Sequence, residues 1–360
     1  MALSTIQNNS FADTAVHGYR NLIINGAMQV AQWSTSTTIP EGTETYGTDR
    51  WYGYANSIDE LVLTMSQDTD APAGFAASTK LTTSTAESAL AADEYSTFTQ
   101  KIEGQNLQNL AFGTSDAQSF TLSFWVKSSL TGTFAVSFYK PNGSEIIGST
   151  YTINSANTWE YKTITIVGNT GSSIVNDNTA GLWVTFTLAA GSDWTSTDNT
   201  SWGSYANGKW SYGQTQNGLI TTLNATWQIT GVQLEVGSEA TPFEHRSYGD
   251  ELARCQRYYY EINYSGAALR LGWGHSAAST QCRMHFQTPV PMRATPTFSS
   301  TNVGYRDNGD VNVGAVSSPV LNSYEGTTYK MQFTVSGATA GTAGELRTTA
   351  AGATTFDAEL

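Results

Sequence analysis

Hydrophobic and polar residues alternate with a period of two along most of the chain. In residues 120–127 every second side chain is apolar, and residues 134–138 and 182–188 repeat the pattern. This period is typical of half-buried antiparallel strands with one face in water. Turn-forming clusters separate the strands, such as Lys140-Pro141-Asn142-Gly143. The pattern predicts an all-β fold in which residues 21–246 form a jelly-roll β-sandwich of two sheets.

The last strand predicted for this sandwich changes its inward face along its length. Trp227 and Ile229 occupy odd positions, whereas Val232 and Leu234 occupy even positions. A strand can switch parity only where it carries an extra residue, and Gly231 stands at the switch. The sequence therefore predicts a β-bulge at Gly231.

A short helix is predicted at the boundary between two domains. Ser247 stands three residues before Asp250, which resembles a capping box, and Tyr248, Leu252 and Cys255 follow at helical spacing. Beyond it, strands are predicted at residues 258–262, 268–273, 283–288, 297–300, 311–316, 330–335 and 355–360. The last of these is expected to be a closing strand that covers a sheet edge. Residues 247–360 are therefore expected to form a small β-rich C-terminal domain. The apolar helix face is expected either at the seam between the domains or near a threefold axis.

Several ordered segments carry a resemblance to a known family. They are residues 21–28 (NLIINGAM), 49–52 (DRWY), 124–128 (FWVKS), 181–188 (GLWVTFTL), 229–260 (ITGVQLEVG, then ATPFEHR and LARCQRYY) and 290–296 (VPMRATP). Together they resemble bacteriophage tail-fibre and virion-appendage proteins. The sandwich is also similar to the carbohydrate-binding jelly rolls appended to polysaccharide-degrading enzymes. The resemblance implies a homotrimer on the outside of a virion, assembled in the host cytoplasm.

The charge balance argues against a nucleic-acid partner. The chain of 360 residues carries 17 basic and 30 acidic residues, a net charge of −13. Nucleic-acid binding requires a basic surface that displaces counterions, so no nucleic-acid partner is expected. No apolar run approaches the roughly 18 residues of a membrane span, so no membrane insertion is expected either. No secretory signal is visible at the N-terminus.

Two further features bear on assembly. Residues 1–20 have mixed polarity and little periodicity, which suits an exposed tail, the start of a trimer stalk, or an anchor on another virion or tail protein. Cys255 and Cys282 are too few for a disulfide framework. They are expected as two buried thiols or as one bridge within the C-terminal domain.

The candidate ligand site lies in a long segment rich in aromatic residues, DWTSTDNTSWGSYANGKWSY, at residues 193–212. Aromatic planes can stack on the C–H face of a sugar while carboxylates and amides pair with its hydroxyls. The predicted carbohydrate-binding residues are Trp194, Trp202, Tyr205, Trp210, Tyr212, Asp193, Asp198, Asn199 and Asn207. The alternative is that these rings pack over the sandwich or against a neighbouring subunit. Trp125 and Trp183 lie on the polar faces of their strands and carry the same two alternatives.

Catalytic and metal-binding patterns are weak in this sequence. No P-loop, G-x-S-x-G or H-E-x-x-H motif occurs. Cys282-x-x-His285 with His275 nearby is the closest approach to a metal site, but ordinary strand positions explain these residues better. No local loop supplies clustered oxygen ligands for a structural calcium. No metal and no cofactor are therefore expected, and only a structural calcium held by residues far apart in the chain stays open as an alternative.

The predicted function is a non-enzymatic virion appendage that binds host cell-surface polysaccharide through exposed aromatic rings. A virion structural or decoration protein without a glycan ligand is one alternative. A polysaccharide depolymerase is the other, since glycoside hydrolysis needs only two suitably spaced carboxylates.

Overall fold

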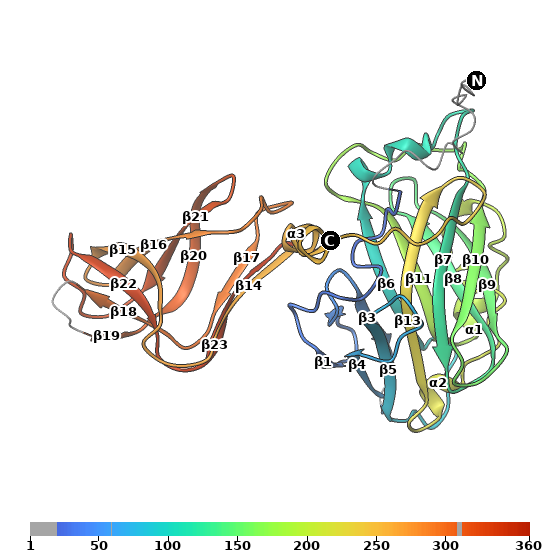
Figure 1. The fold of residues 1–360 in the computed structure, drawn as a ribbon, viewed down its shortest axis with the longest axis horizontal. Helices are drawn as coiled ribbons and strands as arrows, with labels where there is room; N and C mark the ends of the chain where they lie inside the picture. Colours follow the sequence, from blue (N-terminus) through green and yellow to red (C-terminus); the bar gives the residue numbers. More distant parts are fainter. Residues whose placement is uncertain (1–19, 59, 308–311) are drawn as a thin grey trace, which may run out of the picture. The chain divides into compact units, whose positions relative to one another are not determined.

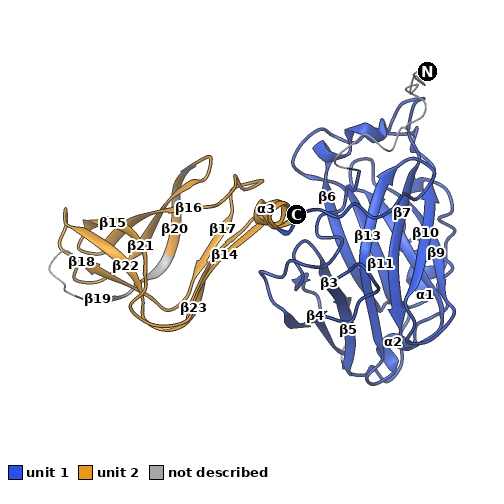
Figure 2. Ribbon diagram, viewed as in Figure 1, with its two compact units in different colours: residues 1–248, 360 blue, residues 249–359 orange. Residues whose placement is uncertain are grey.

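The computed structural model describes residues 20–58, 60–307 and 312–360. All but the last residue of the predicted anchor, 1–20, lies outside the described residues. The chain divides into two compact units, Met1–Tyr248 with Leu360, and Gly249–Glu359 (Figure 2). Both units are built from antiparallel sheets, so the predicted all-β class is confirmed.

The first unit is a sandwich of two sheets (Figure 1). The six-stranded sheet runs in the order β1 (Ser36–Ile39), β4 (Val62–Asp68), β5 (Ser78–Thr85), β13 (Thr226–Val236), β7 (Phe120–Ser128) and β10 (Glu160–Ile166). The seven-stranded sheet runs in the order β12 (Gly203–Ser204), β9 (Glu145–Ile153), β8 (Gly132–Lys140), β11 (Ala180–Ala190), β6 (Tyr95–Glu103), β3 (Tyr52–Asn56) and β2 (Thr45–Tyr46). Short helices join some strands: η3 (Gly104–Asn106), η4 (Gln108–Leu110), α1 (Ser192–Thr195), η5 (Asn207–Lys209) and α2 (Gly218–Thr221).

The alternating apolar residues fill the space between the two sheets. Phe124 of β7 and Phe186 of β11 meet with ring centroids 5.0 Å apart, and both are fully buried. Trp51 stacks on Phe98 at 4.9 Å and is also fully buried. Edge-to-face and offset aromatic pairs of this kind stabilise a core beyond the area that they bury. The predicted sandwich core is confirmed.

The predicted β-bulge is confirmed at Gly231. The register of β13 against β7 shifts between Thr230 and Gln233. Gly231 itself has φ +62°. A Cβ at this position would lie 2.6 Å from Cζ of Phe75. The bulge therefore needs glycine both for its backbone conformation and for space.

We expect Gly231→Ala to destabilise the sandwich by about 2–4 kcal/mol, the sum of left-handed backbone strain and a clash in a packed site. Gly42 is the matched control, because it has φ +66° but a Cβ there would meet no atom of the described residues within 4 Å. Gly42→Ala should therefore lose only about 1 kcal/mol. Denaturant unfolding of both variants checks the difference. Equal losses of unfolding free energy in the two variants would show that the Phe75 side chain can move to accommodate a methyl group at position 231.

A clasp joins the start of the sandwich to its end. Asn21 donates from its amide side chain to the carbonyl oxygen of Val232 at 3.0 Å, and its backbone N–H donates to Glu244 at 2.7 Å. Arg246 donates to the carbonyl oxygens of Ile23, at 3.0 Å, and of Asn21. The segments 21–28, 229–237 and 240–246, which carry the family resemblance, are thus joined by hydrogen bonds at one place in the sandwich.

The second unit begins within helix α3 (Tyr248–Gln256), so the predicted helix after Ser247 is confirmed. The sequence placed the domain boundary at residues 246/247, and the compact units separate between Tyr248 and Gly249. Cys255 and Cys282 are both buried, and neither forms a disulfide. Of the two alternatives for the cysteines, the structure has the two buried thiols.

Two sheets build the second unit. A three-stranded sheet has the order β14 (Tyr259–Tyr264), β23 (Gly352–Asp357) and β17 (Thr297–Ser300). A seven-stranded sheet has the order β19 (Asn312–Ala315), β18 (Val303–Asp307), β22 (Ala343–Thr348), β15 (Arg270–Ala278), β16 (Gln281–Gln287), β21 (Thr328–Thr334) and β20 (Ser317–Glu325). Its core includes Met284, Tyr305 and Phe356, each fully buried.

The final strand corrects one expectation. The sequence suggested that the last strand closes the domain by covering a sheet edge. The strand β23 lies instead in the centre of its sheet and pairs with β14 on one side and with β17 on the other. A central strand carries two ladders of backbone hydrogen bonds, so its loss removes the sheet rather than exposing one edge.

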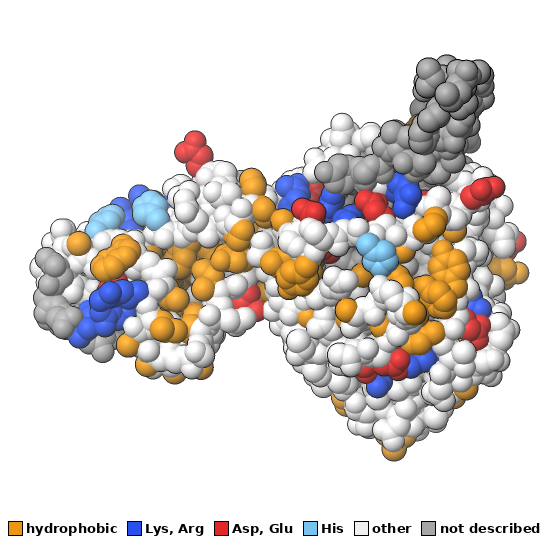
Figure 3. Space-filling view, in the orientation of Figure 1, with side chains coloured by type: hydrophobic (Ala, Val, Ile, Leu, Met, Phe, Trp, Pro, Cys, Tyr) orange, Lys and Arg blue, Asp and Glu red, His pale blue; other side chains and the backbone are white. Residues whose placement is uncertain are grey.

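The surface follows the composition. Figure 3 shows that uncharged polar side chains and backbone dominate the visible face, with few charged side chains among them. Charged residues make up 13% of the sequence. Among the described residues, no helix has the length and apolar character that crossing a bilayer requires.

Candidate functional site

The aromatic segment predicted as the ligand site follows strand β11. It is held to the sandwich at several points rather than standing free. The amide of Gly191 donates to the carbonyl oxygen of Glu94 at 2.8 Å, and the short strand β12 pairs with β9. Farther on, Ser137 donates from its hydroxyl to the carbonyl oxygen of Trp210. The segment therefore lies against the outer face and one edge of the seven-stranded sheet.

Trp210 lies inside an aromatic cluster on that outer face. Its ring meets those of Tyr139, Trp183 and Tyr205 at centroid distances of 5.8, 6.4 and 6.0 Å, all edge to face. Only 8% of Trp210 is exposed. The indole N–H groups of Trp183 and Trp210 are buried and make no hydrogen bond among the described residues. This ring offers no face to a ligand, in contrast to the expectation from the sequence.

Two other tryptophans are fixed by internal contacts. Trp194 lies 4.2 Å from the ring of Tyr95, and its indole N–H donates to the carbonyl oxygen of Asp93 at 2.8 Å. Trp202 packs edge to face on Phe112 at 5.6 Å, and its indole N–H donates to the carbonyl oxygen of Val167 at 2.8 Å. Both rings are half-buried. They lie over different parts of the sandwich and do not form one platform.

The two predicted asparagines shape the segment. Asn199 is 2% exposed and donates from its side chain to the carbonyl oxygen of Lys209 at 2.6 Å. Its own carbonyl oxygen accepts from the amide of Gly148 on β9 at 2.9 Å. Asn207 accepts a hydrogen bond from the hydroxyl of Tyr205 at 2.9 Å. Both amides are engaged within the fold.

The two predicted aspartates are exposed, as Asn207 is, whereas Asn199 is buried. Hydrogen bonds from the backbone and then the side chain of Thr200 lower the pKa of Asp198, so this carboxylate stays charged as part of a tight turn. Asp193 lies in the first turn of α1 and is exposed as well. Neither carboxylate lines the groove that other residues of the segment border.

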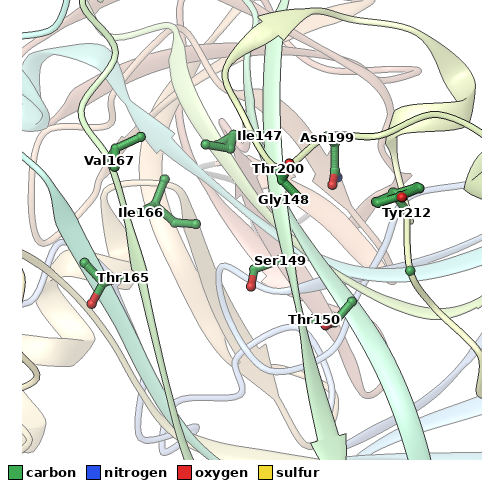
Figure 4. Close-up of a pocket in the computed structure, with 11 residues that line it drawn as sticks. Ile147, Gly148, Ser149, Thr150, Thr165, Ile166, Val167, Asn199, Thr200 and Tyr212 are labelled. Carbon is green, nitrogen blue, oxygen red and sulfur yellow. The ribbon is translucent and has the colours of Figure 1, made fainter.

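That groove is an open cavity of about 320 Å³ between the edges of the two sheets. Strand β9 is paired on one side with β8 and only at its start with β12, and β10 is paired only with β7. Figure 4 shows β9 running between Tyr212 on one side and residues of β10 on the other. The lining residues are Ile147, Gly148, Ser149, Thr150, Thr165, Ile166, Val167, Asn199, Thr200, Tyr212 and Gly213.

The chemistry of this groove is uniform, since none of its lining residues is charged. Hydroxyls come from Ser149, Thr150, Thr165 and Thr200, which can donate and accept hydrogen bonds. Tyr212 is 36% exposed and brings an aromatic ring to the same place. The volume is at the lower end of the range of small-ligand sites. The groove can therefore hold an uncharged ligand rich in hydroxyls, whereas its lining offers no carboxylate for acid–base chemistry.

The weak metal pattern of the sequence is not a site in the structure. Cys282 is buried in the core of the second unit, whereas His285 is exposed, because residues three apart on a strand point to opposite faces. In the parts of the chain that the structure describes, no three side chains of His, Cys, Asp or Glu gather as metal ligands would.

Of the nine predicted residues, only Asn199 and Tyr212 border the groove. The sequence missed the lining from β9 and β10, although a signal was present. Ser149, Thr150 and Thr165 belong to runs of small hydroxyl residues on strands with alternating burial. The sequence did not show that these two strands form neighbouring sheet edges, since edge position depends on topology.

No family model matches the sequence, and no curated protein matches it. Among solved structures, one similar chain is the enzymatically active domain of tailspike protein 4 of bacteriophage CBA120, with 16% identity and a TM-score of 0.32. The match covers 61% of this chain and 22% of the tailspike chain. A second is a family 11 carbohydrate-binding module from Clostridium thermocellum in complex with a beta-1,3-1,4-mixed-linked tetrasaccharide, with 12% identity, a TM-score of 0.28, and coverage of 57% and 99%. A third is an exo-beta-agarase, with 8% identity, a TM-score of 0.29, and coverage of 78% and 41%. These are distant similarities.

Proposed function

We propose that this chain is a non-enzymatic appendage protein of a bacteriophage virion that binds a neutral glycan on the host surface. The observation that carries glycan binding is the uncharged groove between β9 and β10, with its hydroxyls and the exposed ring of Tyr212. A sugar can stack on such a ring and exchange hydrogen bonds with the surrounding hydroxyls. The family resemblance of the ordered sequence segments supports the virion location and a trimeric assembly.

A trimer would bind a host surface with higher avidity than one groove alone. Three grooves on one particle bind a repetitive surface with an effective concentration set by their spacing, so overall avidity exceeds the affinity of one groove. The purified chain is therefore best tested at single sites first, on immobilised neutral oligosaccharides, and then on intact cells. The same cell supernatants, assayed for reducing ends, separate binding from depolymerisation.

We expect Tyr212→Ala to weaken binding of neutral bacterial oligosaccharides on an array by about tenfold. Covering about 60 Å² of ring at roughly 25 cal/mol per Å² contributes about 1.5 kcal/mol, which is a factor of about ten in Kd. The melting temperature should stay within about 2 °C, since the ring is partly exposed. Tyr161→Ala is the matched control, because Tyr161 is 44% exposed and lies on β10 but is not among the residues that line the groove.

Unchanged binding by Tyr212→Ala, with Tyr161→Ala also unchanged, would contradict the groove as the site. Release of reducing sugar by the unaltered chain would make it a depolymerase. Absence of any glycan binding would favour the structural alternative, in which the aromatic segment only packs on its own sandwich, as Trp194, Trp202 and Trp210 do.

A further inference from the structure

The outer face of the seven-stranded sheet in the second unit carries a concentration of cations. Strand alternation places Met284, Tyr305 and Met331 in the core, and their sequence neighbours therefore point outward. We name the basic face by its outward residues Arg270, Arg283, Arg306, Lys330, Arg347 and Trp273. His275 and His285 are exposed between them. Figure 3 shows Lys, Arg and His side chains close to hydrophobic ones on this unit.

This face departs from the charge of the rest of the chain. Residues 1–248 hold nine Lys or Arg against 21 Asp or Glu, whereas residues 249–359 hold eight against nine. Five of those eight cations lie on the basic face. In an acidic protein, a local reversal of sign is a physical signal for an anionic partner, because it raises the local concentration of such a ligand.

Two of the cations are not neutralised by the fold. Arg283 donates to the side-chain oxygen of Gln332 at 3.3 Å, and neither Arg283 nor Lys330 forms an ion pair among residues 20–58, 60–307 and 312–360. The register places Arg283 and His285 on β16 opposite Gln332 and Lys330 on β21. The positive charges of Arg283 and Lys330 are therefore available to an anionic ligand on the outer face of the sheet.

On the side of the basic face formed by β15, β22 and β18, one carboxylate holds two of the arginine side chains in place. Glu345 is 6% exposed and lies between Arg270, at 2.9 Å, and Arg347. It is opposite Trp273 on β15 and Arg306 on β18. One carboxylate shared by two guanidinium groups leaves a net positive charge and fixes the direction of both side chains.

Trp273 supplies a platform in the middle of these charges. It is 65% exposed, the largest exposed fraction among the large hydrophobic side chains that the structure describes. The guanidinium carbon of Arg270 lies 5.6 Å from its ring centroid. A single exposed indole beside cations suits a sugar ring that bears an acidic group, because the C–H face stacks while the acid pairs. A row of several stacked aromatics, which single-stranded nucleic acid favours, is not seen on the described part of this face.

Hollows lie to both sides of the platform. One, of about 370 Å³, is bordered by Arg306 and Arg347, and the other, of about 430 Å³, by His285 and Lys330 together with Glu325. From β18 to β21 there are four strand spacings, or about 19 Å. A ligand that reaches both groups of cations is therefore longer than one sugar ring.

We propose that the basic face binds an anionic polysaccharide, a chain of sugars that carries carboxylate, sulfate or phosphate groups. The sugar over Trp273 stacks on the indole, and acidic groups to either side pair with Arg283 and Lys330 or with Arg306 and Arg347. This site is separate from the neutral groove of the first unit and does not depend on it.

The test uses the full chain and four immobilised probes: hyaluronan, heparin, neutral dextran and single-stranded DNA. We expect saturable binding to hyaluronan or heparin that weakens at least tenfold between 50 and 300 mM salt, because added salt screens exposed charges. Arg283→Ala with Lys330→Ala should weaken it a further tenfold or more. Trp273→Ala should weaken it about tenfold, and Trp273→Phe much less. Lys80→Ala, on the first unit, is the charge-matched control.

The outcomes separate the two proposals. Tyr212→Ala should leave binding to the anionic probes unchanged, so failure of the neutral groove does not affect this result. No saturable binding to either anionic polysaccharide overturns the proposal. So does DNA binding of equal strength that is indifferent to Trp273→Ala, which would mark a general polyanion surface. If the double variant melts early, the comparison of Trp273→Ala with Trp273→Phe decides.

Discussion

A chain that ends after Ala351 should lose the folded second unit while keeping the sandwich. The missing residues include β23, the central strand of the three-stranded sheet, so β14 and β17 lose their shared partner. The truncation also removes Phe356, which is fully buried and lies 5.0 Å from Phe298 and 5.3 Å from Tyr329. Calorimetry should show one unfolding transition instead of two, and proteolysis should digest the chain after the sandwich.

A point substitution in β23 tests the contribution of this strand to the second unit without shortening the chain. Phe356→Ala should destabilise the second unit by about 3–5 kcal/mol, the range for deleting a large buried aromatic side chain. A chain that lacks only Leu360 controls for shortening, and Val320→Ala controls for loss of an apolar side chain, since Val320 is 53% exposed. Retention of the second transition in the chain ending at Ala351 would contradict the central position of β23.

The second large effect is expected at a buried lysine. Lys140, at the end of β8, has a side chain with 0% exposure, and its ammonium lies 3.0 Å from a carboxylate oxygen of Glu145. Burial raises the pKa of the Glu145 carboxyl, but hydrogen bonds led by those of Ser172 and Lys140 outweigh it and lower the pKa. Glu145→Gln should therefore cost about 3 kcal/mol, because it leaves a buried cation without its countercharge.

A double-mutant cycle isolates this pair. Lys140→Met removes the buried cation, so Glu145→Gln should cost about 1–3 kcal/mol less in that background than alone. Asp68→Asn is the matched control, because Asp68 pairs with Lys80 at 3.1 Å near the surface, and exposed pairs contribute less than about 1 kcal/mol. Chemical denaturation of the four chains measures the coupling. The Lys140 ammonium also donates to the carbonyl oxygens of Asn142 and Ser173. A coupling near zero would mean that these carbonyl groups stabilise the buried cation without Glu145.

Local periodicity predicted the elements that it governs directly. Alternation at residues 120–127 predicted β7, and the parity switch predicted the bulge at Gly231, because both depend only on which side of one strand faces the core. The start of α3 followed from the spacing of Tyr248, Leu252 and Cys255. In the second unit, β18, β20 and β22 escaped prediction. Register shifts interrupt β18 and β20, and Pro319 lies within β20, which disturbs the alternation.

Pairing order and ring exposure could not be predicted in the same way. The last strand was expected at a sheet edge, because the sequence of residues 352–357 does not indicate which strands pair with it. In the structure β14 and β17 flank it on both sides. The aromatic segment looked exposed, because its composition resembles a loop. Trp194, Trp202 and Trp210 are instead covered by rings distant in sequence, such as Tyr95 and Phe112. Only tertiary contacts decide which ring of such a segment meets solvent.

The clasp around Asn21 also determines how the sandwich responds to pulling. Chain entry near Asn21 and chain exit near Arg246 are fastened to each other by the hydrogen bonds of Glu244 and Arg246. Tension applied between the N-terminal segment and the second unit passes through these few bonds before it reaches the strand ladders. We therefore expect the sheets of the sandwich to stay folded under tension until these hydrogen bonds break, so that the rate of forced unfolding depends on them.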